Sequence, residues 1–185
     1  YGFELKEVRL KELLNDNKSY SVNGGNKITG LNLFSSHLNY LEPIQYLVNL
    51  QALYLGSNDV SDLSPLSDLK SLRLLDLNST NVSDLNPIAS LKSLRRLYLN
   101  STKVHETSVL HKLTNLKTLT LHSTSISDIY GLKDLIHLEK LDLRHCQIEE
   151  LPIFVTVWEN LEFNQWRDEW TSSGISLFGN PLKNI

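Results

Sequence analysis

The side chains with the greatest chemical potential are one cysteine, six histidines and a recurring set of tyrosine, arginine and aspartate residues. The histidines show none of the short spacings to cysteine or acidic residues that bind zinc. Cys146 directly follows His145, but neighbouring residues of a strand point to opposite faces, which disfavours a catalytic pair. The sequence also contains no nucleophile elbow and no glycine-rich phosphate cradle. We therefore expect no enzyme activity, no metal and no cofactor.

The tyrosine, arginine and aspartate residues have a spacing that favours binding over catalysis. They lie beside pairs of leucines that recur every 22 residues. Tyrosine and arginine often dominate the binding energy of protein interfaces, so we predict a partner-binding patch. Its members are Tyr54, Leu74, Asp76, Arg96, Tyr98, His122, Asp142 and Arg144. The alternative is an ordinary solvated face, whose exposed charge pairs contribute little.

A Leu-x-Leu pair forms the centre of each repeat. The pairs are Leu53/Leu55, Leu75/Leu77, Leu97/Leu99, Leu119/Leu121 and Leu141/Leu143. Alternation with a period of two predicts a strand with its leucines on one face. Leucines spaced by three, such as Leu63, Leu66 and Leu69, indicate a tight 3₁₀-like return. One unit cannot bury its leucines alone, so the strands should stack in parallel.

This pattern resembles leucine-rich repeats of the short, 22-residue class. The resemblance covers residues 28–152 and implies an α/β fold. The expected architecture is a right-handed solenoid with a curved parallel sheet on its concave face and 3₁₀ or irregular returns on its convex face. We expect a single domain over residues 1–185, in which residues 1–27 form an N-terminal cap and residues 153–185 form a C-terminal cap with a final repeat-like strand.

The two caps differ from the repeats in composition. Residues 4–17 alternate apolar and charged side chains with a helical period, which predicts a short amphipathic helix. After residue 152 the period breaks, and an aromatic segment follows that contains all three tryptophans. We expect a helix or helix-turn over residues 154–164 to cover the open end of the core. The pair Ile175 and Leu177, followed by Asn180, restores the repeat.

Two positions inside the repeats carry further expectations. Residues 104–110 lack the usual Asp-Leu-x-Pro sequence, with Thr107 in place of leucine, so we expect a looser or reshaped return there. One small residue follows each Leu-x-Leu pair by three positions and should turn into the interior. These residues are Asn58, Thr80, Thr102, Thr124 and Cys146. We therefore interpret Cys146 as structural.

The two ends of the repeat region carry a second resemblance. The ending Gly-Ile-x-Leu-x-Gly-Asn-Pro-Leu over residues 174–182 and the opening Ile-Thr-Gly-Leu-Asn-Leu over residues 28–33 are similar to the repeat domains of bacterial Roco proteins. In that family the repeats precede a Roc GTPase and a COR dimerisation domain. The resemblance implies a bacterial cytosolic signalling protein, in which the repeats serve a GTPase elsewhere in a longer chain.

Composition limits the classes of partner. The formal net charge of -3 provides no basic field for nucleic acid or an anionic membrane, and no apolar run approaches the length of a membrane span. The single cysteine favours a reducing compartment. We therefore expect a cytoplasmic location, or a secreted or cell-surface one if an N-terminal signal was removed.

The sequence thus predicts a protein–protein interaction module that docks a partner, or other domains of a longer parent chain, on its concave sheet. One alternative is a secreted or surface adhesin similar to internalins, which bind host proteins. A second alternative is a regulatory scaffold without a fixed ligand.

Overall fold

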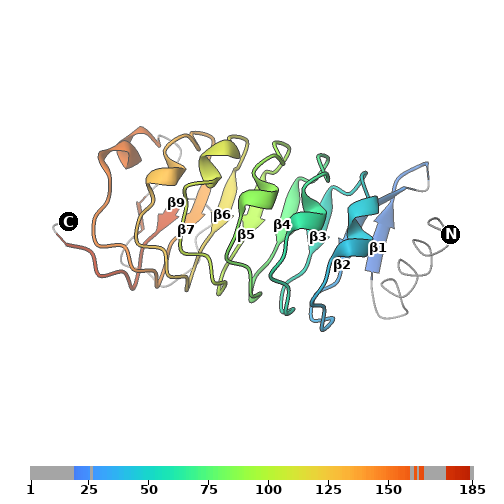
Figure 1. Ribbon diagram of the computed structural model, residues 1–185. Helices are drawn as coiled ribbons and strands as arrows, with labels where there is room; N and C mark the ends of the chain where they lie inside the picture. The colour runs from blue at the N-terminus through green and yellow to red at the C-terminus, as the bar shows by residue number, and fades with distance from the viewer. Residues whose placement is uncertain (1–18, 26, 159–160, 162, 165–173, 184–185) are drawn as a thin grey trace.

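The computed structural model describes residues 19–25, 27–158, 161, 163–164 and 174–183. In these residues the chain forms a stack of repeats, each made of one short strand and one 3₁₀ helix or turn (Figure 1). The strands lie side by side along one side of the stack, and the 3₁₀ helices lie along the other. This arrangement confirms the predicted solenoid with a parallel sheet.

The strands form one continuous sheet with the order β1-β2-β3-β4-β5-β6-β7-β9-β8. Their bounds are β1 Ser19–Val22, β2 Ile28–Asn32, β3 Ala52–Tyr54, β4 Leu74–Asp76, β5 Arg96–Tyr98, β6 Thr118–Thr120, β7 Lys140–Asp142, β8 Phe163–Asn164 and β9 Gly174–Ser176. Strand β1 is antiparallel to β2, and every later pair is parallel.

The pairing register places residues 22 positions apart directly opposite each other from β2 to β7. Leu53 pairs with Leu75, which in turn pairs with Leu97. The inward side chains of these strands are fully buried, as the period-two pattern predicts. Leucines from the returns close the same core, so each repeat buries the apolar face of its neighbours.

The returns on the opposite side contain the 3₁₀ helices. Their bounds are η1 Glu42–Tyr46, η2 Ser64–Leu66, η3 Asn86–Ile88, η4 Leu110–Lys112, η5 Tyr130–Leu132 and η6 Ile153–Val157. Proline at the first or second position of η1, η2 and η3 presets the backbone angle that each helix needs. No helix among the described residues is long and apolar enough to cross a membrane.

The return after β5 is reshaped, as its sequence predicts. Helix η4 begins at Leu110, whereas the 22-residue period would place its start at residue 108. Thr107 occupies the site of a core leucine and is buried. Its hydroxyl donates to the carbonyl of Asp128 (3.1 Å) and accepts from the amide of Gly131 (3.2 Å). The hydroxyl therefore ties this return to the next one.

The predicted interior column is also confirmed. The threonines at 80, 102 and 124 are buried and donate to the carbonyl oxygen three residues earlier, each at 2.7 Å. Asn58 forms more hydrogen bonds than these threonines. Its side-chain nitrogen donates to Leu33 O and Leu55 O, and its side-chain oxygen accepts from two backbone amides of the preceding turn. Asn180 repeats this pattern towards Leu143 and Leu177.

The ends of the sheet differ in part from the expectation. The predicted helix over residues 4–17 lies outside the described residues. A hairpin of β1 and β2 covers the first sheet edge, with Asn23 closing its turn through bonds to the amides of Gly25 and Lys27. The predicted helix over residues 154–164 was wrong in extent, because η6 ends at Val157 and β8 pairs with β9.

The expected final repeat is present. Strand β9 pairs with β7 so that Ile175 lies opposite Leu141, and the side chains of Ile175 and Leu177 are buried. Part of the aromatic segment packs as expected, since Trp158 is buried and its ring meets that of Phe154 edge-on at 5.3 Å. Trp166 and Trp170 lie outside the described residues.

The register makes a direct prediction about stability. Leu97→Ala should lower the free energy of unfolding by about 2–5 kcal/mol, because it empties a fully buried site between two repeats. Tyr98→Ala, at the adjacent and partly exposed position, should cost much less. Denaturant unfolding of both variants tests this, and a loss below about 1 kcal/mol for Leu97→Ala would contradict the register.

Candidate functional site

The register that buries the leucines also arranges the outward side chains. We call the outward side chains of β2 to β7, together with the residues two positions beyond each strand, the sheet face. One row of this face contains Tyr54 on β3, Asp76 on β4 and Tyr98 on β5, which are register partners. The next row contains Leu74 and its register partner Arg96. Parallel strands lie about 4.8 Å apart. Five of the eight predicted binding residues therefore form one cluster.

We call these five residues the binding cluster: Tyr54, Leu74, Asp76, Arg96 and Tyr98. Arg96 is exposed, the Tyr54 side chain is 36% exposed, and the other three are partly buried. Among the described residues no ion pair involves Arg96 or Asp76. The cluster thus presents two aromatic rings, one aliphatic side chain and two unpaired opposite charges to its surroundings.

Phe34 extends this cluster and was not in the predicted patch. Its ring is 56% exposed and lies over Gly56, where an added Cβ would meet the ring at 3.0 Å. The signal for it was present in the repeat, because glycine at the equivalent position of the next strand leaves room for a ring. An exposed phenylalanine beside Tyr54 increases the apolar area that a partner could bury.

The row of Tyr54 becomes buried in the C-terminal half of the sheet face. Thr120, Asp142 and Ser176 lie in the same row as Tyr54, yet each is 2% exposed or less. The carboxylate of Asp142 is paired with Arg144, whose Nε and Nη2 donate to its two oxygens at 2.9 Å and 2.8 Å. The predicted site residues Asp142 and Arg144 are therefore engaged with each other rather than presented to solvent.

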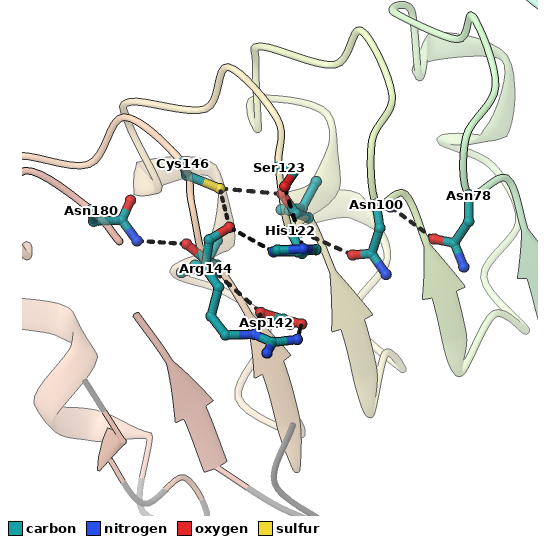
Figure 2. Close-up of polar contacts among 10 residues, drawn as sticks. Asn78, Asn100, His122, Ser123, Asp142, Arg144, Cys146 and Asn180 are labelled. Atoms are coloured by element: carbon teal, nitrogen blue, oxygen red, sulfur yellow. Dashed lines mark hydrogen bonds and ion pairs between the residues drawn. The ribbon is translucent and has the colours of Figure 1, made fainter. Parts of the chain in front are cut away.

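His122 belongs to a row of turn-to-turn hydrogen bonds (Figure 2). The side chain of Asn78 accepts from the amide of Asn100 (2.8 Å), and that of Asn100 accepts from the amide of His122 (2.9 Å). His122 Nδ1 then lies 3.1 Å from the carbonyl oxygen of Arg144. This row links successive repeats, so His122 contributes to the order of the turns that end the strands.

Burial changes the titration of the two central groups of the binding cluster. Partial burial raises the pKa of Asp76, although its hydrogen bond from the Asn78 amide acts in the opposite direction. Burial also raises the pKa of Tyr98, the positive charge of Arg96 lowers it, and Asp76 and Tyr54 raise it further. Asp76 is therefore held in surroundings that disfavour its charge.

Cys146 has a structural environment. Its thiol is buried, donates to Leu121 O at 3.2 Å and lies 3.5 Å from the hydroxyl of Thr124. Burial raises the pKa of this thiol, which keeps it protonated and unreactive. His145 is exposed, and the centre of its ring lies 5.2 Å from that of His122 and 5.4 Å from that of Phe178. Within the described part of the chain, no group of three histidine, cysteine or acidic residues could hold a metal ion.

An open hollow lies beside the reshaped return, on the opposite side from the sheet face. It has a volume of about 590 Å³, and its lining mixes His105, His111 and Lys133 with Glu106 and Asp128. The exposed ring of Tyr130 lies at its edge, with the Lys133 ammonium 4.9 Å from the ring centre. Asp134 also lines the hollow, so acidic and basic groups are mixed there and select no class of ligand.

Comparisons with known proteins identify the repeats. Residues 48–90 and 92–134 each match the family described as Leucine Rich repeats (2 copies). Together with the stacked parallel strands, this match shows leucine-rich repeats in a solenoid-like fold. No curated protein sequence matches the chain.

Solved structures show the same fold. An internalin (inlF) from Listeria monocytogenes aligns with a TM-score of 0.65 and 22% identity over 98% of this chain and 57% of its own. An internalin C2 from the same species aligns with a TM-score of 0.62 and 27% identity, over 85% of this chain and 74% of its own. The ectodomain of a plant membrane receptor kinase from Arabidopsis thaliana was solved in complex with Casparian strip integrity factor 2. It aligns with a TM-score of 0.72 and 20% identity, over 96% of this chain and 24% of its own. The chain thus spans little more than half of the first of these.

The environment of Asp76 predicts a dependence of stability on pH. The folded chain binds the Asp76 proton more tightly than the unfolded chain does, so ionisation costs stability as the pH rises from the ordinary pKa of 3.8 through the higher folded value. The free energy of unfolding of Asp76→Asn, taken relative to that of the wild type, should therefore be higher at neutral pH than at a pH below 3.8. Urea unfolding at both pH values tests this, with the exposed Asp68→Asn as control. A relative loss at neutral pH would contradict it.

The contact between Thr107 and Gly131 predicts a steric effect. A Cβ on residue 131 would lie 2.1 Å from the carbonyl oxygen of Thr107, so Gly131→Ala must separate two returns. We expect a loss of about 1–3 kcal/mol in the free energy of unfolding. Gly24→Ala is the matched control, since nothing lies within 4 Å of its added Cβ. Equal stability of the two variants would show that the returns are not in close contact.

Proposed function

We propose that the chain is a protein-binding module that docks its partner on the binding cluster and the adjoining Phe34. The observation that carries this proposal is the contrast along one sheet face. In the row of Tyr54, the outward residues from β2 to β5 are exposed or partly buried, and the side chains of Phe34 and Arg96 lie beside this row. In the same row from β6 onwards, Thr120, Asp142 and Ser176 are buried.

General physical chemistry supports binding at this place. Solenoids of stacked repeats use extended sheet surfaces for recognition. Tyrosine, tryptophan and arginine are enriched among the residues that dominate the energy of protein interfaces. The aromatic rings bury a large area, and the guanidinium group of arginine donates several hydrogen bonds in a fixed geometry. The binding cluster also combines apolar area with both signs of charge, which can fix the orientation of a partner.

The biological setting is a separate part of the proposal. The 27% identity to an internalin over 74% of that chain favours the internalin-like alternative, in which the module acts outside the cell on a protein of another cell. The Roco-type alternative rests on the sequence motifs of the two ends and would place the module in the cytoplasm beside a GTPase. Identification of the partner distinguishes these settings.

The test compares three proteins as baits in a pull-down from extracts of the source organism and of cells it contacts. The first is the unchanged chain, and the second carries Tyr54→Ala, Arg96→Ala and Tyr98→Ala. The third, a matched control, carries Tyr40→Ala, Lys70→Ala and Tyr130→Ala at exposed positions outside the sheet face. Circular dichroism and unfolding curves confirm that all three baits are folded.

We expect a protein that is retained by the unchanged and control baits and lost by the second bait. Binding of the purified partner should weaken more than about tenfold, because truncation of one interface tyrosine commonly costs over 1 kcal/mol. Equal retention by all three baits would place the site elsewhere. Retention unaffected by single alanines across the sheet face would favour the scaffold alternative.

A further inference from the structure

Asp76 is the residue of the sheet face whose chemistry the fold does not explain. Its side chain is partly buried at the centre of the binding cluster, and its one hydrogen bond in the described structure comes from the Asn78 amide at 2.9 Å. No lysine, arginine or histidine within the described ranges forms an ion pair with it. A partly buried charge without a counter-ion costs folding free energy.

The turn after the strand requires the oxygen of Asp76 but not its charge. At the equivalent position two strands earlier, Asn32 Oδ1 accepts the amide of Phe34 at 3.0 Å, which is the same bond. A neutral asparagine therefore completes this turn in the same protein. The negative charge at position 76 must serve something other than the local backbone.

Asp142 shows how an arginine two residues later can neutralise an aspartate at this position of the repeat. It is three strands from Asp76 in the same register row and accepts the amide of Arg144 in the same way. The guanidinium of Arg144 also grips both carboxylate oxygens (Figure 2). At Asp76 the residue two positions later is Asn78, so the turn itself supplies no such guanidinium. Within the described part of the chain, Asp142 has an internal counter-ion and Asp76 has none.

Tyr54 and Tyr98 flank the open side of Asp76. They are its register partners on the two neighbouring strands, so their attachment points are about 10 Å apart with Asp76 midway. A cation bound to the carboxylate would therefore lie between the two strands that carry the tyrosines. Cations are attracted to aromatic faces within about 6 Å of the ring centre. We call this set of one carboxylate between two aromatic side chains the notch, and its chemistry suits a guanidinium group.

We infer that the notch formed by Tyr54, Asp76 and Tyr98 receives an arginine side chain of the partner protein. The inference rests on the proposed function and specifies the chemistry of the partner at that site. Arginine fits better than lysine, because its planar fork donates to both oxygens while its faces meet the two rings. Arg96, exposed at the start of β5, lies one row from the notch and forms no ion pair with Asp76 among the described residues.

The test begins with a random linear peptide library displayed on phage and selected against the immobilised full chain. Parallel selections use Asp76→Asn, which preserves the oxygen that the turn needs, and Asp68→Asn, which removes one exposed charge from a return. Library peptides selected on the unchanged chain and on Asp68→Asn should be enriched in arginine at one position. This enrichment should be absent from the peptides selected on Asp76→Asn.

A double-substitution cycle then locates the contact. Replacement of the enriched arginine by citrulline, which has the same shape without the charge, should weaken binding to the unchanged chain about tenfold or more. The same replacement should change binding to Asp76→Asn by less than about twofold. Tyr54→Ala and Tyr98→Ala should each weaken the arginine peptide more than the citrulline peptide.

The outcomes separate this inference from the proposed function. Selected peptides that need Tyr54 and Tyr98 but show no preference for arginine would overturn the inference and leave the binding face in place. A preference for acidic or apolar peptides at these residues would do the same. Peptides whose binding is unaffected by Tyr54→Ala and Tyr98→Ala, or a selection that enriches nothing, would count against both.

Discussion

The parallel pairing of strands at steps of 22 residues is the constraint on which the rest of the structure depends. Because side chains alternate along a strand, a shift of one residue would turn every leucine of a repeat outward. The buried pairs such as Leu53–Leu75 and Leu75–Leu97 therefore fix the register. Once it is fixed, side chains 22 residues apart on the outer face must be neighbours, and the binding cluster is a consequence of the core.

Periodic features of this fold could be predicted from the sequence, and non-periodic ones could not. The strands, the interior threonines and the last strand with Asn180 follow from spacing alone. The burial of Asp142 could not be foreseen, because the period that places it in the same row as Tyr98 and Thr120 carries no information on what covers that row. The helix expected over residues 154–164 ends early, and β8 within that range pairs with β9, a contact that the repeat spacing does not predict.

Asp76 and Asp142 show how one position of a repeat can serve two purposes. Both close the turn after their strand, but among the residues that the structure describes only Asp142 of the two is paired with a cation. The charge of Asp76 has no role in the fold, since Asn32 completes the same turn without it. Residues that reduce stability without a structural benefit are typical of binding sites, where a partner supplies the missing interaction.

The central claim is that Asp76 is a partly buried carboxylate without a counter-ion in the free chain. The most direct measurement is its pKa, obtained by following the side-chain carboxyl carbon by NMR as the pH is changed, with Asp76→Asn to assign the signal. The account predicts a pKa above the ordinary value of 3.8, because burial disfavours the charge. A pKa at or below 3.8 would show that the chain already compensates this charge, and would contradict the account.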